Sequence, residues 1–331
     1  MIRLHGSLRH AAPALCLTLA AACSAADSPP AIPGPGEGQI RVATWNIRFF
    51  PEPPSDEGPG TDVRRTGEIL AGLDADLIAV QEIADPAVLE ELLAGVNAEL
   101  AAQATSTGGT RVRHYVSRLA DSGGHGGQFV GFVYDTLALE LTGVRTLWSL
   151  QMTPDLRPAL YGWARSRRGG LDFQVVTVHN DSGTDDRDYQ NRLRFLDSLD
   201  DELAGRWAAD ADIIVLGDLN TMGREAGEGL PRISADAEIA GLDRRLAEMD
   251  LRRVQSDPSC TEYYRGRGTR LDHVLVSTRS ALGATDLEAS VFGYCGENEC
   301  RRLDARRMPY DYARVSDHCP VVVDLEDVDR D

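Results

Sequence analysis

Short apolar runs that end in an acid, an amide or an imidazole recur along this chain. The runs are RVATWN, DLIAVQE, VVTVH, IIVLGDLN, LDHVLV and SDHCPVVV, and their polar groups are Asn46, Glu82, His179, Asp218, Asn220, Asp272, Asp317 and His318. Runs that are apolar throughout are typical of strands buried on both faces of a sheet. The pattern therefore predicts a fold built around sheets, with polar residues collected where the strands end.

Segments with helical periodicity lie between these runs. We expect helices at 62–73, 86–102, 186–207 and 241–249. We expect strands at 40–50, 76–81, 111–117, 128–134, 145–150, 160–167, 173–179, 212–216, 271–277 and 320–325. Helices interspersed with many strands predict an α/β protein whose helices cover the faces of its sheets.

Composition limits the class of partner. The chain has 331 residues, a hydrophobic content of 42% and a formal net charge of −18. That charge argues against a protein that coats nucleic acid, although an enzyme with a locally basic groove is still compatible with it. All 34 cationic residues are arginine. Arginine suits forked contacts to phosphate, but biased genome composition is the simpler explanation.

The N-terminal region predicts export. Residues 1–23 combine Arg3 and Arg9 with the apolar stretch 11–22, as a signal peptide does. Cys23 resembles a lipobox cysteine, so either lipid attachment at Cys23 or ordinary cleavage is expected. Residues 24–38 are rich in Pro and Gly and predict a flexible linker. We expect one domain at 39–327, a tail at 328–331, a monomer, and a periplasmic, secreted or cell-surface location in a bacterium.

Four cysteines follow the signal segment: Cys260, Cys295, Cys300 and Cys319. They allow three disulfide pairings. Because only four residues separate Cys295 from Cys300, we expect a local bridge there, which leaves Cys260 to pair with Cys319. A zinc site, for which the spacings are wrong, and free buried thiols are the alternatives.

Several of the polar groups suit a hard cation. An amide at Asn46 and a carboxylate at Glu82 can hold Mg²⁺ through oxygen. Asp218 and Asn220 alternate, so on a strand they would point to the same face. Taken alone, Asn46 also fits a turn and Glu82 a helix start, and only the recurrence of such groups favours a site.

The histidines suit phosphate-ester hydrolysis beside such a cation. His179 leaves an apolar strand, where it is either a hydrogen-bonded core residue or a donor to a phosphate oxygen. His318 follows Asp317, and Asp272 precedes His273. A carboxylate fixes the tautomer of an imidazole and raises its basicity. His273 would face away from Asp272, so we do not expect it to be catalytic.

The motifs TWN, QE, VH, GDLN, LDHVLV and SDHCPV, in this order, resemble the endonuclease/exonuclease/phosphatase superfamily of deoxyribonuclease-I-like enzymes. The resemblance covers residues 40–325. It implies a four-layer α/β/β/α sandwich of two mainly antiparallel sheets flanked by helices. It further implies that Glu82, assisted by Asn46 and Asp317, binds Mg²⁺ or Mn²⁺, and that Arg157 lies near the substrate phosphate.

The resemblance also implies roles in proton transfer. His318, oriented by Asp272, would activate water as the general base, or Asp218 would do so in an alternative scheme. His179 and Asn220 would stabilise the pentacovalent phosphorane. Asn180-Asp181-Ser182 stands where many bacterial relatives carry Leu-Lys-Ser, which removes a cation near the groove.

The substrate implied first is an extracellular nucleic acid, cleaved at its phosphodiester bonds by in-line water attack. A phospholipid or sphingomyelin phosphodiesterase is the alternative within enzymes, although the sequence has no apolar hairpin suited to a membrane. A non-catalytic binding protein on the same fold is the alternative of another class. Arginines between 265 and 307 predict either a basic rim around the site or solvated loop charges.

Overall fold

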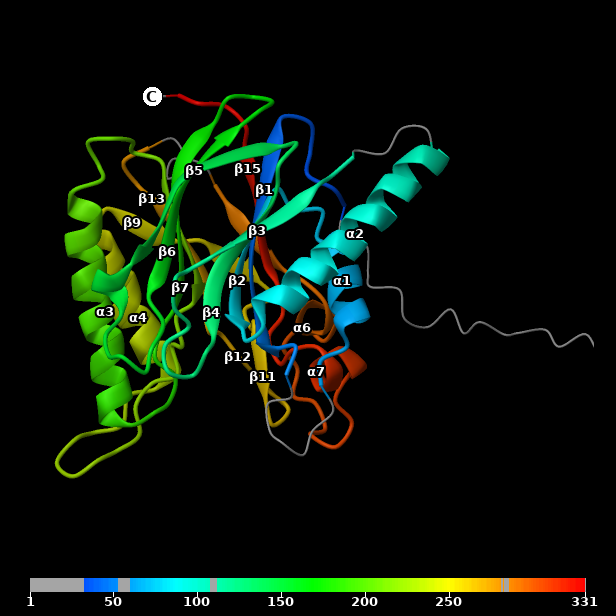
Figure 1. Cartoon of the computed structure of the whole chain (residues 1–331). Coiled ribbons are helices and arrows are strands. Elements are labelled where there is room, and N and C mark those ends of the chain that lie inside the picture. The colour runs from blue at the N-terminus through cyan, green and yellow to red at the C-terminus, as the bar shows by residue number, and fades with distance from the viewer. Residues whose placement is uncertain (1–32, 53–59, 108–111, 281, 283–285, 331) are drawn as a thin grey trace, which may run out of the picture.

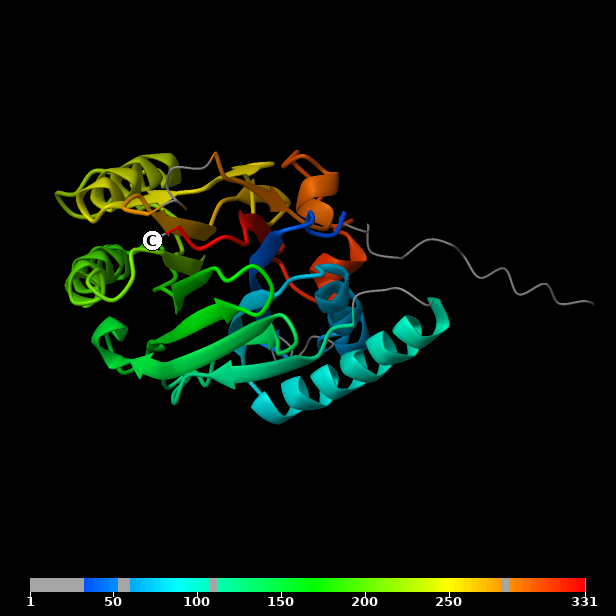
Figure 2. The same ribbon diagram turned by 90° about the horizontal axis from the view of Figure 1, so that it is seen from above.

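Two β-sheets packed face to face form the centre of the molecule (Figures 1 and 2). The computed structural model describes residues 33–52, 60–107, 112–280, 282 and 286–330. The seven-stranded sheet has the order β10 (Gln255–Asp257), β14 (Glu288–Val291), β15 (Val321–Glu326), β1 (Gln39–Phe50), β2 (Leu77–Ile83), β4 (Phe129–Asp135), β3 (Tyr115–Leu119). The six-stranded sheet has the order β5 (Leu139–Leu147), β6 (Ala159–Ser166), β7 (Asp172–His179), β8 (Ile213–Asp218), β13 (Asp272–Ser277), β9 (Leu251–Arg253).

Most neighbouring strands in both sheets are antiparallel. The parallel pairs are β1 with β2, β10 with β14, and β7 with β8. A separate hairpin joins β11 (Glu262–Tyr264) to β12 (Arg267–Thr269). The expected sandwich of two mainly antiparallel sheets is therefore confirmed.

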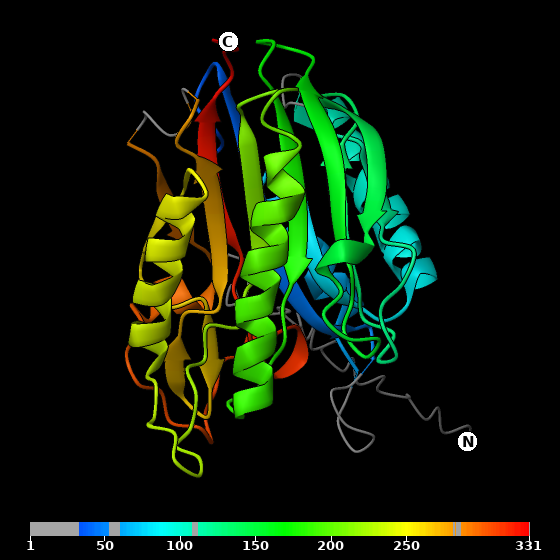
Figure 3. The same cartoon turned by 90° about the vertical axis from the view of Figure 1, so that its left-hand side faces the viewer.

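Helices cover the outer face of each sheet. Helices α1 (Val63–Gly72) and α2 (Pro86–Thr107) pack on the seven-stranded sheet, where their leucines join one apolar cluster with Trp45. Helices α3 (Asp186–Ala204) and α4 (Ala235–Glu248) lie across the six-stranded sheet (Figure 3). The shorter helical elements are η1 (Trp148–Leu150), α6 (Tyr294–Glu297) and α7 (Tyr310–Arg314).

The largest apolar cluster fills the space between the sheets. Phe132 and Val42 from one sheet and Phe173 and Leu216 from the other are buried in it. Fully burying each such side chain stabilises the fold by about 1.5 to 3 kcal/mol. This core holds the two sheets in a fixed relation, so the strand ends that carry polar residues are held rigidly.

Some element boundaries differ from those expected. Helix α4 begins at Ala235 rather than at 241, because the Ser234 side chain accepts a hydrogen bond from the N–H of Ala237 and caps the helix. The strand expected at 111–117 begins at Tyr115; residue 111 lies outside the described residues, and Arg113 is buried in ion pairs with Asp76 and Asp135 instead of pairing in the sheet. Short strands β9 to β12 and β14 were not predicted, because three- and four-residue pairings carry little periodicity.

The expected disulfide pairing is wrong. The bridges join Cys260 to Cys300 and Cys295 to Cys319, with Cα–Cα distances of 5.6 and 6.1 Å. Cys295 lies in helix α6, and the left-handed backbone at Glu299 and Cys300 then reverses the chain. The two neighbouring cysteines therefore face different partners.

The expected signal segment, Cys23 and most of the linker lie outside the described residues. In the part of the chain that the structure describes, no helix is both long enough and apolar enough to cross a membrane.

Candidate active site

The site lies where strands of both sheets end side by side. Asn46 and Glu82 come from adjacent strands β1 and β2 of one sheet, where β1 pairs with β2. His179 and Asp218 end β7 and β8 of the other sheet and are register partners. Asp272 begins β13 directly opposite Asp218. Residues spread over most of the chain therefore meet at one edge of the sandwich.

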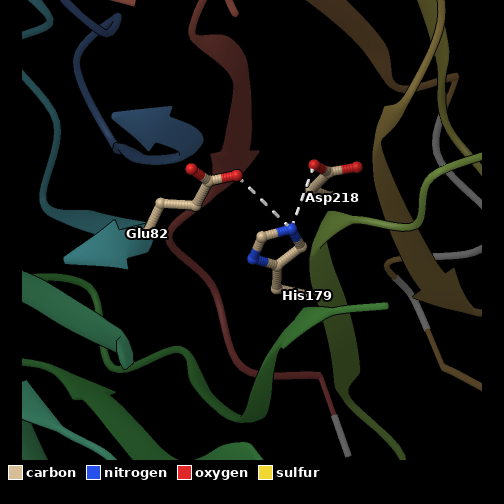
Figure 4. Close-up of side chains that lie close together, drawn as sticks. All are labelled: Glu82, His179 and Asp218. Carbon is tan, nitrogen blue, oxygen red and sulfur yellow. Dashed lines mark ion pairs between the residues drawn. The ribbon is translucent and has the colours of Figure 1, made fainter. Parts of the chain in front are cut away.

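Glu82, His179 and Asp218 form one group of possible metal ligands (Figure 4), whose ligand atoms all lie within 4.8 Å of one another. The Nε2 atom of His179 is 3.7 Å from Glu82 Oε1 and 3.5 Å from Asp218 Oδ2. The amide of Asn46 donates to the same two carboxylates, at 2.9 and 3.0 Å. Two carboxylates held this close repel each other, so a cation between them would stabilise the arrangement.

Asp218, Asp272 and His318 form a second group that shares Asp218 with the first. The His318 Nδ1 atom is 2.8 Å from Asp272 Oδ2, and its Nε2 atom is 3.9 Å from Asp218 Oδ2. Burial alone lowers the pKa of His318, but the Asp272 and Asp218 carboxylates outweigh it and raise that pKa well above its ordinary value. The Asp272 bond fixes the ring so that Nε2 points toward Asp218.

Burial also shifts two other titrating groups. It raises the pKa of Asp218 to about 7, with a further upward contribution from Asp272. It lowers the pKa of His179 well below its ordinary value, helped by the charges of Arg157 and His318. The site thus combines a carboxylate whose pKa is raised with two imidazoles whose pKa values are shifted in opposite directions, and strongly shifted groups of this kind are typical of acid–base sites.

The GDLN turn depends on backbone that favours glycine. Gly217 has φ +149°, and a Cβ there would lie 2.0 Å from the Val178 carbonyl oxygen. Asn220 has φ +52°, and its N–H donates to the Asp218 carboxylate oxygen Oδ1 at 2.9 Å. Its side-chain amide donates to the carbonyl of Asn180 at 3.1 Å. This turn places the side chains of Asp218 and Asn220 next to each other in the site.

Asp317 occupies a different position from the first group. In the described part of the chain it belongs to neither ligand group, and its Oδ2 atom lies 3.7 Å from Arg48 Nη1. Its Oδ1 atom is buried without a hydrogen-bond partner among the described residues. The expectation that Asp317 assists Glu82 in binding metal stays a prediction.

Arg157 and Gln128 enter the site from neighbouring loops. Arg157 is buried, and its Nη2 atom lies against His179 Nε2. Its charge is held near Glu82 and Asp218, although burial lowers its pKa. Gln128 donates to Glu82 Oε2 at 3.2 Å. Its position directly before β4 resembles that of the other strand-end residues, a signal that sequence analysis did not use.

Two hydroxyl residues that support the site were also missed. The Ser316 hydroxyl donates to the Asn46 carbonyl at 2.7 Å and accepts from the N–H of His318 at 3.0 Å. The Thr261 hydroxyl accepts from the N–H groups of Leu271 and Asp272, each at 3.0 Å. Only Ser316, in the SDH motif, had a sequence signal. His273 lies away from the site, 3.0 Å from the Thr221 hydroxyl.

The arrangement suits hydrolysis of a phosphate ester. One side offers oxygen ligands for a divalent cation, and the other offers an imidazole oriented by a carboxylate. Arg157 and His179 add nitrogen donors beside Glu82 and Asp218. Such groups can neutralise a phosphate, activate water and stabilise the charge of the transition state.

The fold is shared with solved structures. An endonuclease/exonuclease/phosphatase from Bacteroides vulgatus has 16% identity and a TM-score of 0.56, covering 87% of this chain and 98% of that chain. D. rerio TDP2, complexed with a single-strand DNA product, has 17% identity and a TM-score of 0.54, covering 86% and 98%. The 3'-5' exonuclease NExo from Neisseria meningitidis has 18% identity and a TM-score of 0.52, covering 86% and 98%.

A search of curated protein sequences gave no match. The sequence model of one family matches residues 43–318, a span that runs from β1 to the SDH motif and contains all the strand-end groups described above. The chain therefore belongs to the endonuclease/exonuclease/phosphatase family.

Proposed function

We propose that this protein is a divalent-metal-dependent phosphodiesterase that hydrolyses nucleic acid outside the cytoplasm. The observation that carries the proposal is the convergence of two ligand groups on Asp218. Glu82 and His179 belong to one group, and Asp272 and His318 belong to the other. A metal-bound phosphate and an attacking water would need these two kinds of group within one small space.

The residues fit a divalent ion. Glu82 would hold it, with Asn46 and Asp317 as the assisting ligands. The buried Oδ1 atom of Asp317, which has no hydrogen-bond partner among the described residues, supports that role. Mg²⁺ or Mn²⁺ bound there would neutralise charge on the phosphate and on the leaving oxygen. The carboxylate and amide oxygens are the donors that such hard cations prefer.

The chain's own residues would move the proton. The Asp218–His318 pair would accept the proton of the attacking water, and Asp272 would keep the His318 ring in place. His179, Asn220 and Arg157 would donate hydrogen bonds to the non-bridging oxygens as their negative charge grows.

Nucleic acid is the substrate we propose, and an oxidising compartment is the location. Two disulfides are typical of proteins outside the cytoplasm. Two proteins that share the fold act on or bind nucleic acid: the D. rerio TDP2 structure contains a single-strand DNA product, and NExo is a 3'-5' exonuclease. These likenesses support a nucleic-acid substrate.

The test compares substrates and one variant. The purified protein should hydrolyse bis(p-nitrophenyl) phosphate and oligonucleotides in Mg²⁺, and EDTA should abolish both activities. Asp218→Asn should lower both rates on the order of 10²- to 10⁴-fold while the melting temperature is retained. Asp197→Asn, an exposed carboxylate on α3, is the matched control and should leave both rates unchanged. Hydrolysis of sphingomyelin in preference to oligonucleotides would contradict the nucleic-acid assignment.

A further inference from the structure

We propose that an exposed arginine surface beside the active site binds single-stranded nucleic acid. This surface, here called the hairpin surface, consists of residues 264–267 at the tip of the β11–β12 hairpin and residues 301–307. The inference deepens the proposed function, because it names the class of substrate that the same site would receive.

The hairpin and the second segment form one continuous surface. The Leu303 N–H donates to the Gly266 carbonyl at 2.8 Å, and the Tyr263 hydroxyl donates to the Arg301 carbonyl at 2.7 Å. The disulfide Cys260–Cys300 joins the bases of the two segments. Gly266 has φ +78°, and a Cβ there would lie 2.2 Å from the Leu303 oxygen. This close backbone approach keeps the segments together.

The hairpin surface begins next to the site. Glu262, the first residue of β11, forms a β-bridge with His318, and Tyr263 donates its N–H to the Asp317 carbonyl at 3.0 Å. Since a strand rises about 3.3 Å per residue, Arg265 lies roughly 10 Å along the strand from that bridge. A nucleic-acid strand with one phosphate in the site would therefore reach the hairpin with its flanking nucleotides.

The charge of the hairpin surface opposes that of the molecule. Its exposed cationic residues are Arg265, Arg267, Arg301, Arg302, Arg306 and Arg307. Arg301 pairs with Glu299, and within the described ranges the other five have no carboxylate at ion-pair distance. The whole chain carries a net charge of −18 and would repel a polyanion. Unpaired arginines beside the site would offset that repulsion where the substrate must bind.

An exposed aromatic ring favours a single strand over a duplex. Tyr264 is 57% exposed, and the Arg265 guanidinium lies 5.0 Å from its ring centroid. Unpaired bases stack on such rings, and arginine adds a cation–π contribution. Bases in a duplex are already stacked on each other and are not available to Tyr264.

The test separates binding from chemistry. Arg265→Glu/Arg267→Glu and Arg302→Glu/Arg307→Glu should each raise the KM for a single-stranded oligonucleotide by at least on the order of tenfold and lower the salt dependence of binding. Hydrolysis of bis(p-nitrophenyl) phosphate should change less than about twofold, because this small diester does not reach the hairpin surface. Tyr264→Ala should weaken oligonucleotide binding about five- to 100-fold.

The matched control reverses two arginines elsewhere. Arg165→Glu/Arg167→Glu changes exposed residues at the end of β6. Arg165 is the strand-register partner of Asp172, which begins β7, so this pair lies at the end of the sheet opposite to His179. Binding is measured in EDTA by fluorescence anisotropy. The labelled ligands are single-stranded DNA, single-stranded RNA, duplex DNA and anionic phospholipid vesicles. Substitutions in the hairpin surface should weaken the binding of the single strands alone.

The inference is overturned if the control pair has an equal effect, if KM is unchanged in both hairpin variants, or if vesicles rather than single strands bind through the hairpin surface. If the wild type binds oligonucleotides through this surface but hydrolyses no diester, the proposed function fails and the surface stands. If all the hairpin variants lose bis(p-nitrophenyl) phosphate hydrolysis, the surface is structural and the inference fails.

Discussion

His318 and Asp272, 46 positions apart in the chain, form a hydrogen bond of 2.8 Å between Nδ1 and Oδ2. They belong to different sheets: Asp272 begins β13, and His318 precedes β15. Both side chains are buried, so the carboxylate stabilises a charged imidazole and holds its orientation with little screening by water. The hydrogen bond between His318 and Asp272 therefore depends on how the two sheets pack together.

Asp272→Asn should separate this role from folding. The amide keeps the shape of the carboxylate but removes the charge that fixes and stabilises the His318 imidazole. We expect kcat for bis(p-nitrophenyl) phosphate to fall on the order of 10²- to 10⁴-fold, with circular dichroism and the melting temperature retained. Full activity in this variant would remove the pair from the mechanism. Asp197→Asn on the exposed face of α3 is the control.

Glu82→Gln should weaken metal binding more than folding. Glu82 is half-buried and already accepts bonds from Asn46, Phe49 and Gln128, which an amide satisfies only in part. Loss of a group that merely supports a metal ligand costs about 10- to 100-fold in affinity. Loss of the charge of the proposed ligand itself should therefore raise the Mg²⁺ concentration for half-maximal rate by at least on the order of 100-fold. The rate is measured as a function of Mg²⁺ concentration, and Mg²⁺ binding is measured by isothermal titration calorimetry. Glu91→Gln on α2 is exposed and should change neither; an unaltered Mg²⁺ requirement in Glu82→Gln would argue for other ligands.

Thr261→Val should disturb the site without touching it. The Thr261 hydroxyl accepts from the N–H groups of Leu271 and Asp272, and its own carbonyl accepts from Cys319 at 2.7 Å. Removing the hydroxyl leaves two buried donors unpaired, at a cost of about 1 to 3 kcal/mol. We expect kcat to fall while KM for the small diester stays constant, because Asp272 loses its fixed position. Thr261→Ser should restore the rate, and a Thr261→Val enzyme with wild-type kcat would show that the hydroxyl serves stability alone.

Reduction of the disulfides should lower stability and activity together. Cys260 precedes Thr261 and Cys319 follows His318, so the bridges tie both segments to the loop that carries Cys295 and Cys300. Loss of each bridge should cost about 2 to 5 kcal/mol. Thermal unfolding and diester hydrolysis with and without dithiothreitol measure the effect, and the pairs Cys260→Ser/Cys300→Ser and Cys295→Ser/Cys319→Ser separate the two bridges. Unchanged melting after complete reduction would mean that packing alone holds these segments.

The local pattern of the sequence determined the strands and the polar groups at their ends. Runs such as IIVLGDLN are apolar throughout because both faces of β8 are buried, and that composition is visible without coordinates. The order of the motifs likewise indicated the sandwich, and strand-end positions identified Glu82, His179 and Asp218. Thr261 has no such signal, since its hydroxyl acts on backbone N–H groups ten residues away.

The tertiary structure decided which of these groups meet. Cys295 bonds with Cys319 rather than with its neighbour Cys300, because a helical turn and two left-handed residues reverse the chain between them. Arg48 and Asp317 also meet only in the folded protein, because they are far apart in sequence and the pairing of β1 with β15 brings them into contact. The local sequence pattern indicates whether a side chain is buried. Which residues distant in sequence it contacts depends on how the two sheets pack together.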